Sequence, residues 1–203
     1  MQAAADAAVE RFGGIDVVMA NAGIATYGSV LQVDPEAFKR LLDINVLGVF
    51  HTVRATLPSV LERRGYVLIV SSLAAYAAAP GLAPYNASKA AVEQFANALR
   101  LEVGYRGVDV GSAHMSWIDT AMVRDTKSDL STFAEMLTKL PWPLSITTSI
   151  DKCGEAFVAE HGPGTIACHQ AGVDRVDADA VGRELEGEAL GEGVERGLAD
   201  AVQ

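Results

Sequence analysis

Tyr85 and Lys89 lie four residues apart and are the pair of side chains in this sequence best suited to proton transfer. If Tyr85 begins or lies within a helix, a four-residue step puts both side chains on one helix face. A phenol normally loses its proton near pH 10, and a nearby cation favours the phenolate and lowers that pKa. Tyr85 is therefore predicted to exchange a proton with a substrate oxygen near neutral pH. Ser72, at the end of an apolar run, is predicted to orient the same oxygen.

Alternating strands and helices are expected to position these residues. Short apolar runs bounded by turn residues predict strands at 15–20, 66–70 and 108–113. Helical patterns cover 2–12, 34–63 and 85–102, and the second of these opens with a capping Asp34 followed by Pro35. This alternation predicts an α/β fold with a parallel sheet and flanking helices. The packing side of the helix at 85–102 is expected to comprise Ala91, Val92, Phe95, Ala98 and Leu99.

Polar residues follow each predicted strand. Asn21 follows the first strand, Ser72 the second, and the segment 114–120 the third. Ligands of parallel α/β sheets bind at the carboxyl ends of the strands, so these residues are expected at one ligand-binding edge. Asn45 lies among apolar residues within the predicted helix 34–63, and its amide needs partners if it is buried. A structural and a catalytic role for Asn45 both remain open on this reasoning.

Charge and composition exclude several function classes. The net charge is −10, of which −2 falls on residues 1–153 and −8 on residues 154–203. No basic stripe suits nucleic acid or anionic lipid. The uncharged run 65–88 is broken by Pro80, Gly81 and Pro84, which argues against a membrane span. The two cysteines, Cys153 and Cys168, form no disulfide framework or zinc pattern, so we expect a cytoplasmic protein without a metal site.

Four ordered motifs together resemble the classical short-chain dehydrogenase/reductase family. They are FGGIDVVMANAG, Asn45 in LLDINVLGVF, Ser72, and Tyr85 with Lys89 in YNASK. The step of 27 residues from Asn45 to Ser72 and of 13 residues from Ser72 to Tyr85 are both similar to that family's spacing. The resemblance covers roughly residues 2–153. It implies a Rossmann-like sheet and an NAD(P)-dependent oxidoreductase that interconverts an alcohol and a carbonyl.

The resemblance also implies a role for each motif residue. Tyr85 would be the general acid or base, and Lys89 would lower its pKa and bind the nicotinamide ribose. Ser72 would orient the carbonyl, and Asn45 would hold a water in a proton relay. Further cofactor contacts would come from Asn21, Ala22, Gly23, Ile118 and Thr120.

The sequence departs from the family pattern in two places. The Gly-rich TGxxxGxG turn that holds the cofactor pyrophosphate is not found in the sequence, and by the family's layout the chain begins in the third helix. We therefore expect an N-terminally incomplete sheet. The family's Pro-Gly before the Ile-x-Thr segment is replaced by Met115 and Ser116.

Two domains and two functions follow as expectations. Residues 1–153 are expected to form a partial short-chain dehydrogenase/reductase domain, and residues 154–203 an acidic, Gly-rich, poorly ordered tail. Segment 128–142 resembles the family's substrate lid, and Met115, Trp117, Met122, Trp142 and Leu144 suggest an apolar pocket for a small, moderately apolar substrate. The first function is an oxidoreductase that uses NAD or NADP and forms a homodimer or homotetramer through helices 34–63 and 85–102. The alternative is an inactive member that keeps only this interaction surface.

Overall fold

The computed structural model of the chain describes residues 1–129, 137 and 145–159. Its centre is a three-stranded parallel sheet in the order β1-β2-β3, formed by Val17–Ala20, Tyr66–Val70 and Asp109–Ala113. The register aligns Val18 with Val67 and Val67 with Val110. The predicted α/β class is confirmed. The second strand has the predicted bounds, whereas the first and third begin slightly later than predicted.

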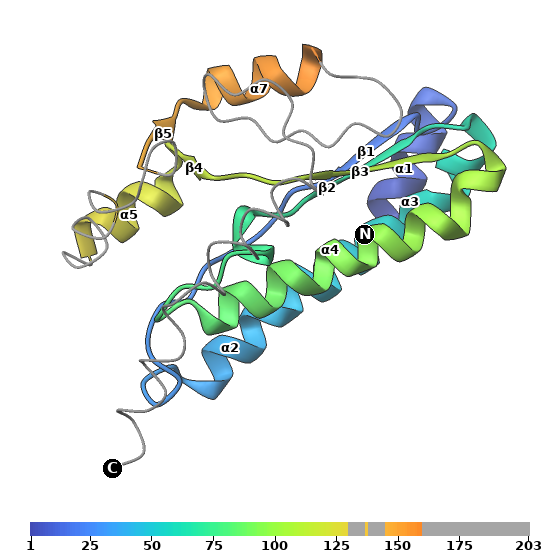
Figure 1. Ribbon diagram of the computed structural model, residues 1–203. Helices are drawn as coiled ribbons and strands as arrows, with labels where there is room; N and C mark the ends of the chain where they lie inside the picture. Colours follow the sequence, from blue (N-terminus) through green and yellow to red (C-terminus); the bar gives the residue numbers. More distant parts are fainter. Residues whose placement is uncertain (130–136, 138–144, 160–203) are drawn as a thin grey trace.

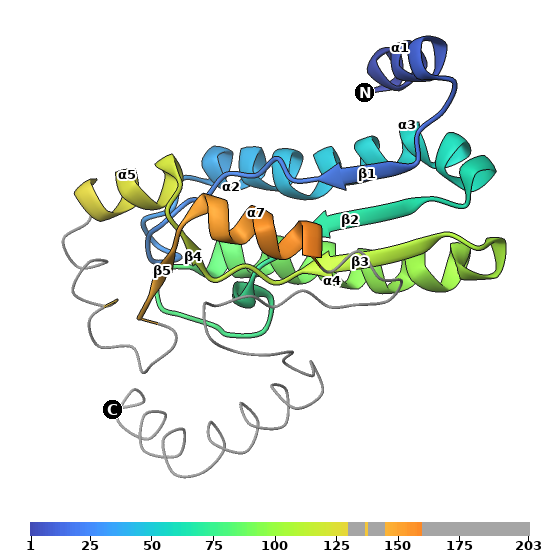
Figure 2. The ribbon, with the colours of Figure 1, turned by 90° about the horizontal axis from the view of Figure 1, so that it is seen from above.

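Helices cover both faces of this sheet (Figure 1). One layer comprises α2 (Pro35–Leu42), α3 (Gly48–Arg63) and α4 (Ala83–Val103), and α7 (Ile150–Ala159) crosses the opposite face (Figures 1 and 2). A π-helical turn, η1 (Asp43–Leu47), joins α2 to α3. The first helix, α1 (Gln2–Phe12), packs against α3. The core is the aliphatic layer between the sheet and the α3–α4 pair, and it includes Val49, Val53, Val60, Val67, Ile69, Val92, Leu99 and Val110.

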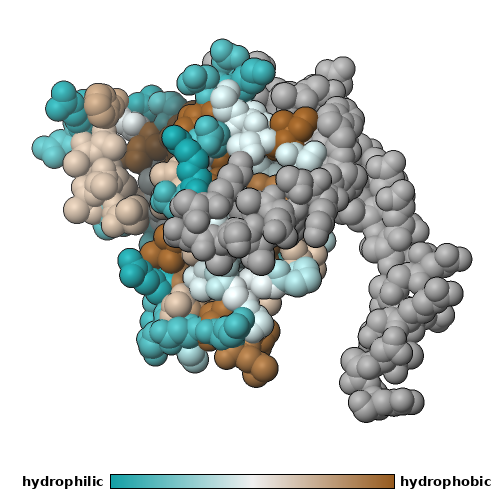
Figure 3. Space-filling model, turned by 90° about the vertical axis from the view of Figure 1, so that its left-hand side faces the viewer, coloured by the Kyte–Doolittle hydropathy of each residue, from teal (hydrophilic) through white to brown (hydrophobic). Residues whose placement is uncertain are grey.

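Shorter elements gather at the carboxyl ends of the strands. Chain segments after β2 and β3 form the 3-10 turn η2 (Leu73–Ala75), strand β4 (Trp117–Ile118) and helix α5 (Ala121–Asp129). A second 3-10 turn, η3 (Gly104–Arg106), lies between α4 and the start of β3. Strand β4, at the carboxyl ends, pairs in parallel with β5 (Thr147–Thr148). This edge of the sheet faces the viewer in Figure 3, where hydrophobic and hydrophilic residues are interspersed.

The packing side of α4 differs from the sequence-based expectation. Val92 and Leu99 are buried as predicted, but Ala91 and Ala98 are exposed. The buried side is shifted around the helix and includes three polar residues, Ser88, Lys89 and Glu93. Alanine carries too little apolar surface to fix the rotation of a helix, so the side chains packed around α4 decide it.

One stretch of helix raises the question of a membrane. Among the described residues, Pro35–Arg63 is long and apolar enough to cross a bilayer by length and composition alone, which is weak evidence. Val49, Val53 and Val60 of this stretch are buried against the sheet and neighbouring helices. Of the most apolar window of this stretch, 22% is buried.

The expected lid, tail, domain division and incomplete sheet can be compared with the described residues. Most of the expected lid, 128–142, lies outside the described residues, as do Trp142, Leu144 and residues 160–203 of the expected tail. Helix α7 runs across the expected domain division at residue 153. Among the described strands β1 pairs only with β2, and Val17 and Met19 on it are about half exposed.

Candidate active site

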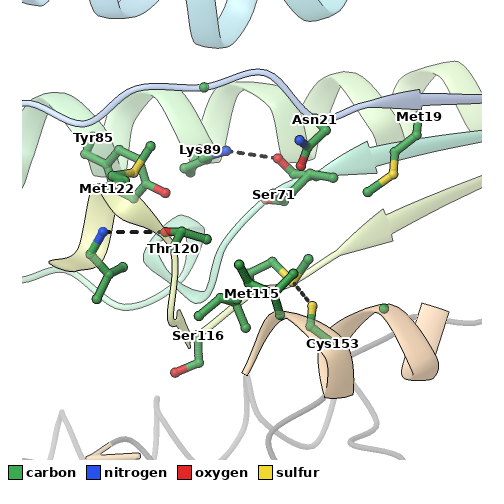
Figure 4. A pocket seen from close by; sticks show the side chains of 16 residues that line it. Met19, Asn21, Ser71, Tyr85, Lys89, Met115, Ser116, Thr120, Met122 and Cys153 are labelled. Atoms are coloured by element: carbon green, nitrogen blue, oxygen red, sulfur yellow. Dashed lines mark hydrogen bonds between the residues drawn. The ribbon is translucent and has the colours of Figure 1, made fainter. Parts of the chain in front are cut away.

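The Tyr85–Lys89 pair lies on α4 near its start, as the four-residue spacing predicted. Leu82 caps the helix and Pro84 occupies its first turn, where a missing backbone N–H costs no helical hydrogen bond. The ammonium of Lys89 donates to the carbonyl of Val70 at 2.9 Å, at the end of β2. Its Nζ lies 5.7 Å from the centre of the Tyr85 ring. Both side chains therefore point toward the carboxyl edge of the sheet (Figure 4).

The electrostatics of this pair differ from the expectation of a lowered tyrosine pKa. Burial raises the pKa of Tyr85 to about 12, against the opposing effect of a hydrogen bond with Ser72. Burial also lowers the pKa of Lys89 to about 8. Desolvation disfavours the charged form of each group and is the largest cause of both shifts. At neutral pH the phenol therefore carries its proton.

Ser72 lies beside Tyr85 at the start of η2. Its Oγ accepts a hydrogen bond from the amide of Ala74 at 3.1 Å and caps the turn. The same hydroxyl lies 3.2 Å from the carbonyl of Met115, to which it donates. The side chains of Ser72 and Tyr85 are also hydrogen-bonded to each other. The two groups predicted to act on one substrate oxygen are therefore adjacent.

Asn45 is buried in the π-helical turn η1, with only 1% of its surface exposed. Its Oδ1 accepts from the amide of Ile24 at 2.8 Å, and its Nδ2 donates to the carbonyl of Ile24 at 2.9 Å and to Ser88 Oγ at 3.1 Å. The side-chain amide thus pairs with the irregular segment after β1 and with α4. Single-turn π-helices occur often at functional sites, where they redirect one side chain.

A cavity of about 390 Å³ opens in front of Lys89 and Tyr85 (Figure 4). Four of the predicted cofactor contacts after β1 and β3 line it: Asn21, Gly23, Ile118 and Thr120. Ala22 is exposed and is not among the lining residues. A Cβ atom at position 23 would lie 3.4 Å from Asn45 Oδ1 and 3.8 Å from Lys89 Nζ. Because glycine has no Cβ atom, the space beside these two side chains stays open.

Sequence reasoning missed Ser71 and Cys153, two residues of this cavity. Ser71 is 1% exposed, lines the cavity, and its Oγ has no hydrogen-bond partner among the described residues. Cys153 and Met115 meet on the opposite wall, with their sulfur atoms 3.6 Å apart. The pair of serines at 71–72 was the sequence feature that could have identified Ser71 as a site residue. Nothing in the sequence indicated that α7 would bring Cys153 to the site.

The segment that replaces the family's Pro-Gly follows a defined path. The carbonyl of Met115 accepts a hydrogen bond from the amide of Leu73 at 3.0 Å and a second one from the Ser72 hydroxyl. Thr120 directly precedes α5, and its carbonyl accepts a hydrogen bond from the amide of Arg124 at 3.0 Å. The segment is thus joined to the turn after β2 at one end and to α5 at the other.

A second, smaller cavity of about 200 Å³ also borders Tyr85. Of the residues predicted to form an apolar pocket, Met115, Trp117 and Met122 line it. The remaining wall is largely apolar and comes from the loop after β2, through Leu73, Ala74, Ala77, Ala78, Ala79 and Leu82. Tyr85 borders both cavities.

Comparisons with known proteins show the family of the chain. The family model described as short chain dehydrogenase matches residues 1–131. An uncharacterised NAD-dependent oxidoreductase of Mycobacterium tuberculosis is 36% identical over 129 residues, covering 63% of this chain and 46% of the relative. The human dehydrogenase/reductase SDR family member 4 is 36% identical over 119 residues, covering 58% of this chain and 43% of the relative. The chain therefore spans about half the length of the curated relatives it matches.

Solved structures have a similar fold. A gluconate 5-dehydrogenase from Burkholderia cenocepacia, in complex with NADP and tartrate, superposes with a TM-score of 0.68 at 26% identity, covering 76% of this chain and 60% of that one. An NAD+-bound xylitol dehydrogenase gives a TM-score of 0.69 at 20% identity over 77% of this chain and 65% of that one, which reflects the fold alone. With the family model, the relatives and the fold in agreement, the chain belongs to the short-chain dehydrogenase family.

Proposed function

We propose that this protein is an NAD(P)-dependent oxidoreductase that interconverts an alcohol and a carbonyl on a small, moderately apolar substrate. One observation carries the proposal: Tyr85 lines both a larger cavity with several polar lining residues and a smaller, largely apolar one. A proton-transfer group between a cofactor cavity and a substrate cavity suits transfer between two bound molecules. The apolar lining of the smaller cavity favours a substrate that is itself moderately apolar.

The residues of the larger cavity fit the nicotinamide half of such a cofactor. Ser71 brings a buried hydroxyl without a partner, and Lys89 brings a cation beside it. Gly23 leaves room for close approach of a ligand to the backbone. The names of the relatives support a nicotinamide cofactor, because one is an NAD-dependent oxidoreductase and one similar structure contains NADP. The proposal covers either cofactor.

In this proposal the bound cofactor gives or takes the hydride, and the side chains handle the proton and the orientation. Ser72 donates a hydrogen bond to the substrate oxygen and holds it beside Tyr85. Tyr85 gives its proton to that oxygen during reduction and takes it back during oxidation. Lys89 stabilises the phenolate that remains and contacts the nicotinamide ribose. Asn45 supports the relay that returns a proton to Lys89, and Asn21, Ala22, Gly23, Ile118 and Thr120 hold the cofactor.

The raised pKa of Tyr85 supports a role as proton donor. A phenol with a pKa of about 12 is fully protonated at neutral pH, which is the form that carbonyl reduction requires. Loss of that proton leaves a buried phenolate, which is unfavourable without a cation. Lys89, on the same face of α4, supplies the cation within the site.

Cofactor titration tests this proposal. Purified protein is titrated with NADH and with NADPH while cofactor fluorescence is followed, and saturable binding of at least one is expected. Tyr85→Phe should bind that cofactor with unchanged affinity and lose turnover by a factor of about 10² to 10⁴. Tyr105→Phe is the matched control, because Tyr105 is 82% exposed after α4. Full activity in Tyr85→Phe would refute the assigned role.

A second candidate function is an inactive family member that retains an interaction surface. Exposed hydrophobic side chains favour an interface on these helices: Leu47 in η1 is 48% exposed, Phe50 in α3 is 39% exposed, and Leu101 in α4 is 84% exposed. The absence of saturable binding of either cofactor would support this candidate and overturn the first. Both candidates include self-association as a homodimer or homotetramer through helices 34–63 and 85–102.

The proposal extends to organisation and location. Residues 1–153 form the partial dehydrogenase domain, and residues 154–203 form an acidic, Gly-rich tail. The protein acts in the cytoplasm on a small molecule, without nucleic acid, membrane or metal as partner. The weak basic content and the separate cysteines support these statements.

A further inference from the structure

A buried carboxylate lies one helical turn beyond Lys89 and is not used by the proposed chemistry. Glu93, on α4, is 5% exposed. Its Oε2 accepts a hydrogen bond from Ser112 Oγ at 2.5 Å and lies 2.7 Å from Nε2 of His114. Ser112 and His114 are 1% and 3% exposed, and their spacing of two residues at the end of β3 turns both toward α4.

The loop after β2 supplies a third partner. The hydroxyl of Tyr76 is hydrogen-bonded to Glu93 and lies 3.1 Å from His114 Nε2. The rings of Tyr76 and His114 also meet edge to face, with their centres 5.1 Å apart. Tyr76 itself is 49% exposed, so its ring is at the surface and its hydroxyl reaches inward. Glu93 thus joins three segments that are distant in the sequence.

The charge on Glu93 persists because its partners stabilise it. Burial alone would raise the pKa of this carboxyl, but hydrogen bonds from His114, Ser112 and Tyr76 lower it to about 2. A buried charge that loses one partner is strongly unfavourable, so each donor is held firmly in place. The ionised Glu93 therefore fixes the positions of Tyr76 and His114.

Tyr76 and His114 each lie next to a wall of the apolar cavity. Tyr76 belongs to the loop 73–82, and its neighbours Ala77, Ala78 and Ala79 line that cavity. His114 directly precedes Met115, which lines the same cavity and whose carbonyl accepts from Leu73 and Ser72. Through Tyr76 and His114, both walls of the apolar cavity are therefore connected to the carboxylate of Glu93.

We propose that Glu93 is a positioning residue that clamps the loop 73–82 to the segment 114–117 through Tyr76 and His114, and so sets the shape of the substrate cavity. Its effect is on substrate affinity and on the order of the loop. It does not contact the reacting atoms. The statement about substrate rests on the proposed function, whereas the statement about the loop stands on the geometry alone.

Amide hydrogen exchange on the full chain tests the clamp without any activity measurement. Tyr76→Phe keeps the ring and removes only the hydroxyl. The amides of Tyr76 and Ala77, which are bonded to the carbonyl of Leu73, should exchange about tenfold faster in this variant, and those of Val67 and Ile69 in β2 should not change. Tyr105→Phe is the matched control and should leave the loop unchanged. Unchanged exchange at 76–77, or an equal increase in β2, would overturn the clamp.

A double-mutant cycle assigns the effect to Glu93. In the background of Glu93→Gln, the additional change Tyr76→Phe should accelerate loop exchange by less than about threefold, because its charged partner has gone. The same tenfold effect in both backgrounds would show that Tyr76 acts independently of Glu93. If Glu93→Gln does not fold, the single Tyr76→Phe experiment decides the question.

Kinetics test the consequence for substrate. In Tyr76→Phe we expect a rise of about tenfold in KM for a carbonyl substrate, with kcat within about twofold and unchanged affinity for the cofactor. An equal fall in kcat and kcat/KM would contradict a positioning role. If the wild type binds no cofactor, the proposed function fails, and the exchange experiment still decides whether the clamp exists.

Discussion

Glu93 provides the most quantitative prediction, through the dependence of stability on pH. Replacement by Gln removes the charge with little change in shape. The partners of Glu93 lower its pKa from the usual 4.5 to about 2. Because the folded state holds the ionised form more strongly than the unfolded chain does, the carboxylate contributes stability above pH 4.5. That contribution is lost as the pH falls through about 2.

The shift sets the size of the effect. Each pKa unit corresponds to about 1.4 kcal/mol, so ionised Glu93 contributes about 3 kcal/mol at pH 5 and about 1.5 kcal/mol at pH 3. The free energy of unfolding of Glu93→Gln should therefore be about 3 kcal/mol lower than that of the wild type at pH 5. This difference should shrink by about half at pH 3. Working below pH 5 limits the contribution from titration of imidazole groups.

Urea denaturation followed by circular dichroism measures this difference at several pH values between 3 and 5. Glu102→Gln is the matched control, because Glu102 is an exposed carboxylate on the same helix. Its free energy of unfolding should stay within about 0.5 kcal/mol of the wild type at each pH. A Glu93→Gln difference below about 1 kcal/mol at pH 5, or one that does not change with pH, would refute the reasoning.

Two further predictions concern Asn45 and the exposed helix surface. Asn45→Ala leaves the amide and carbonyl of Ile24 without their partners and should lower the free energy of unfolding by about 3 kcal/mol in urea, whereas Asn97→Ala, at a half-buried position, should cost less than about 1 kcal/mol. An equal cost for both would show that Asn45 is not a structural link. Phe50→Asp should shift the protein toward monomer in sedimentation velocity, and Leu31→Asp, at a 98% exposed position outside both helices, should not. A wild type that is monomeric at every concentration would contradict the proposed interface.

The positions of several elements followed from local chemistry. The strand Tyr66–Val70 is a continuous β-branched and apolar run that fits a buried strand and no other short element. The start of α2 was equally clear, because Asp34 accepts from the amide of Glu36 at 3.1 Å and Pro35 occupies the first helical position. Both signals lie within a few neighbouring residues, so the sequence alone carries them.

The rotation of helices was not available from local patterns. Ala91 and Ala98 suit a buried or an exposed position almost equally, and the expected packing side of α4 was wrong for both. Glu93 on that helix would be expected in solvent from its type. Its burial depends on Ser112 and His114, which arrive from a strand about 20 residues further along the chain.

The sequence by itself determined which residues do the chemistry that we propose: the spacing of Ser72, Tyr85 and Lys89 is a property of the chain. Tertiary structure decided the pKa of the reacting group. Burial, which depends on all surrounding elements at once, raises the pKa of Tyr85 to about 12, whereas the four-residue spacing alone had suggested a lowered value. The π-helical turn that directs Asn45 toward Ile24 is likewise a result of packing, since the residues of 43–47 would also fit an ordinary α-helix.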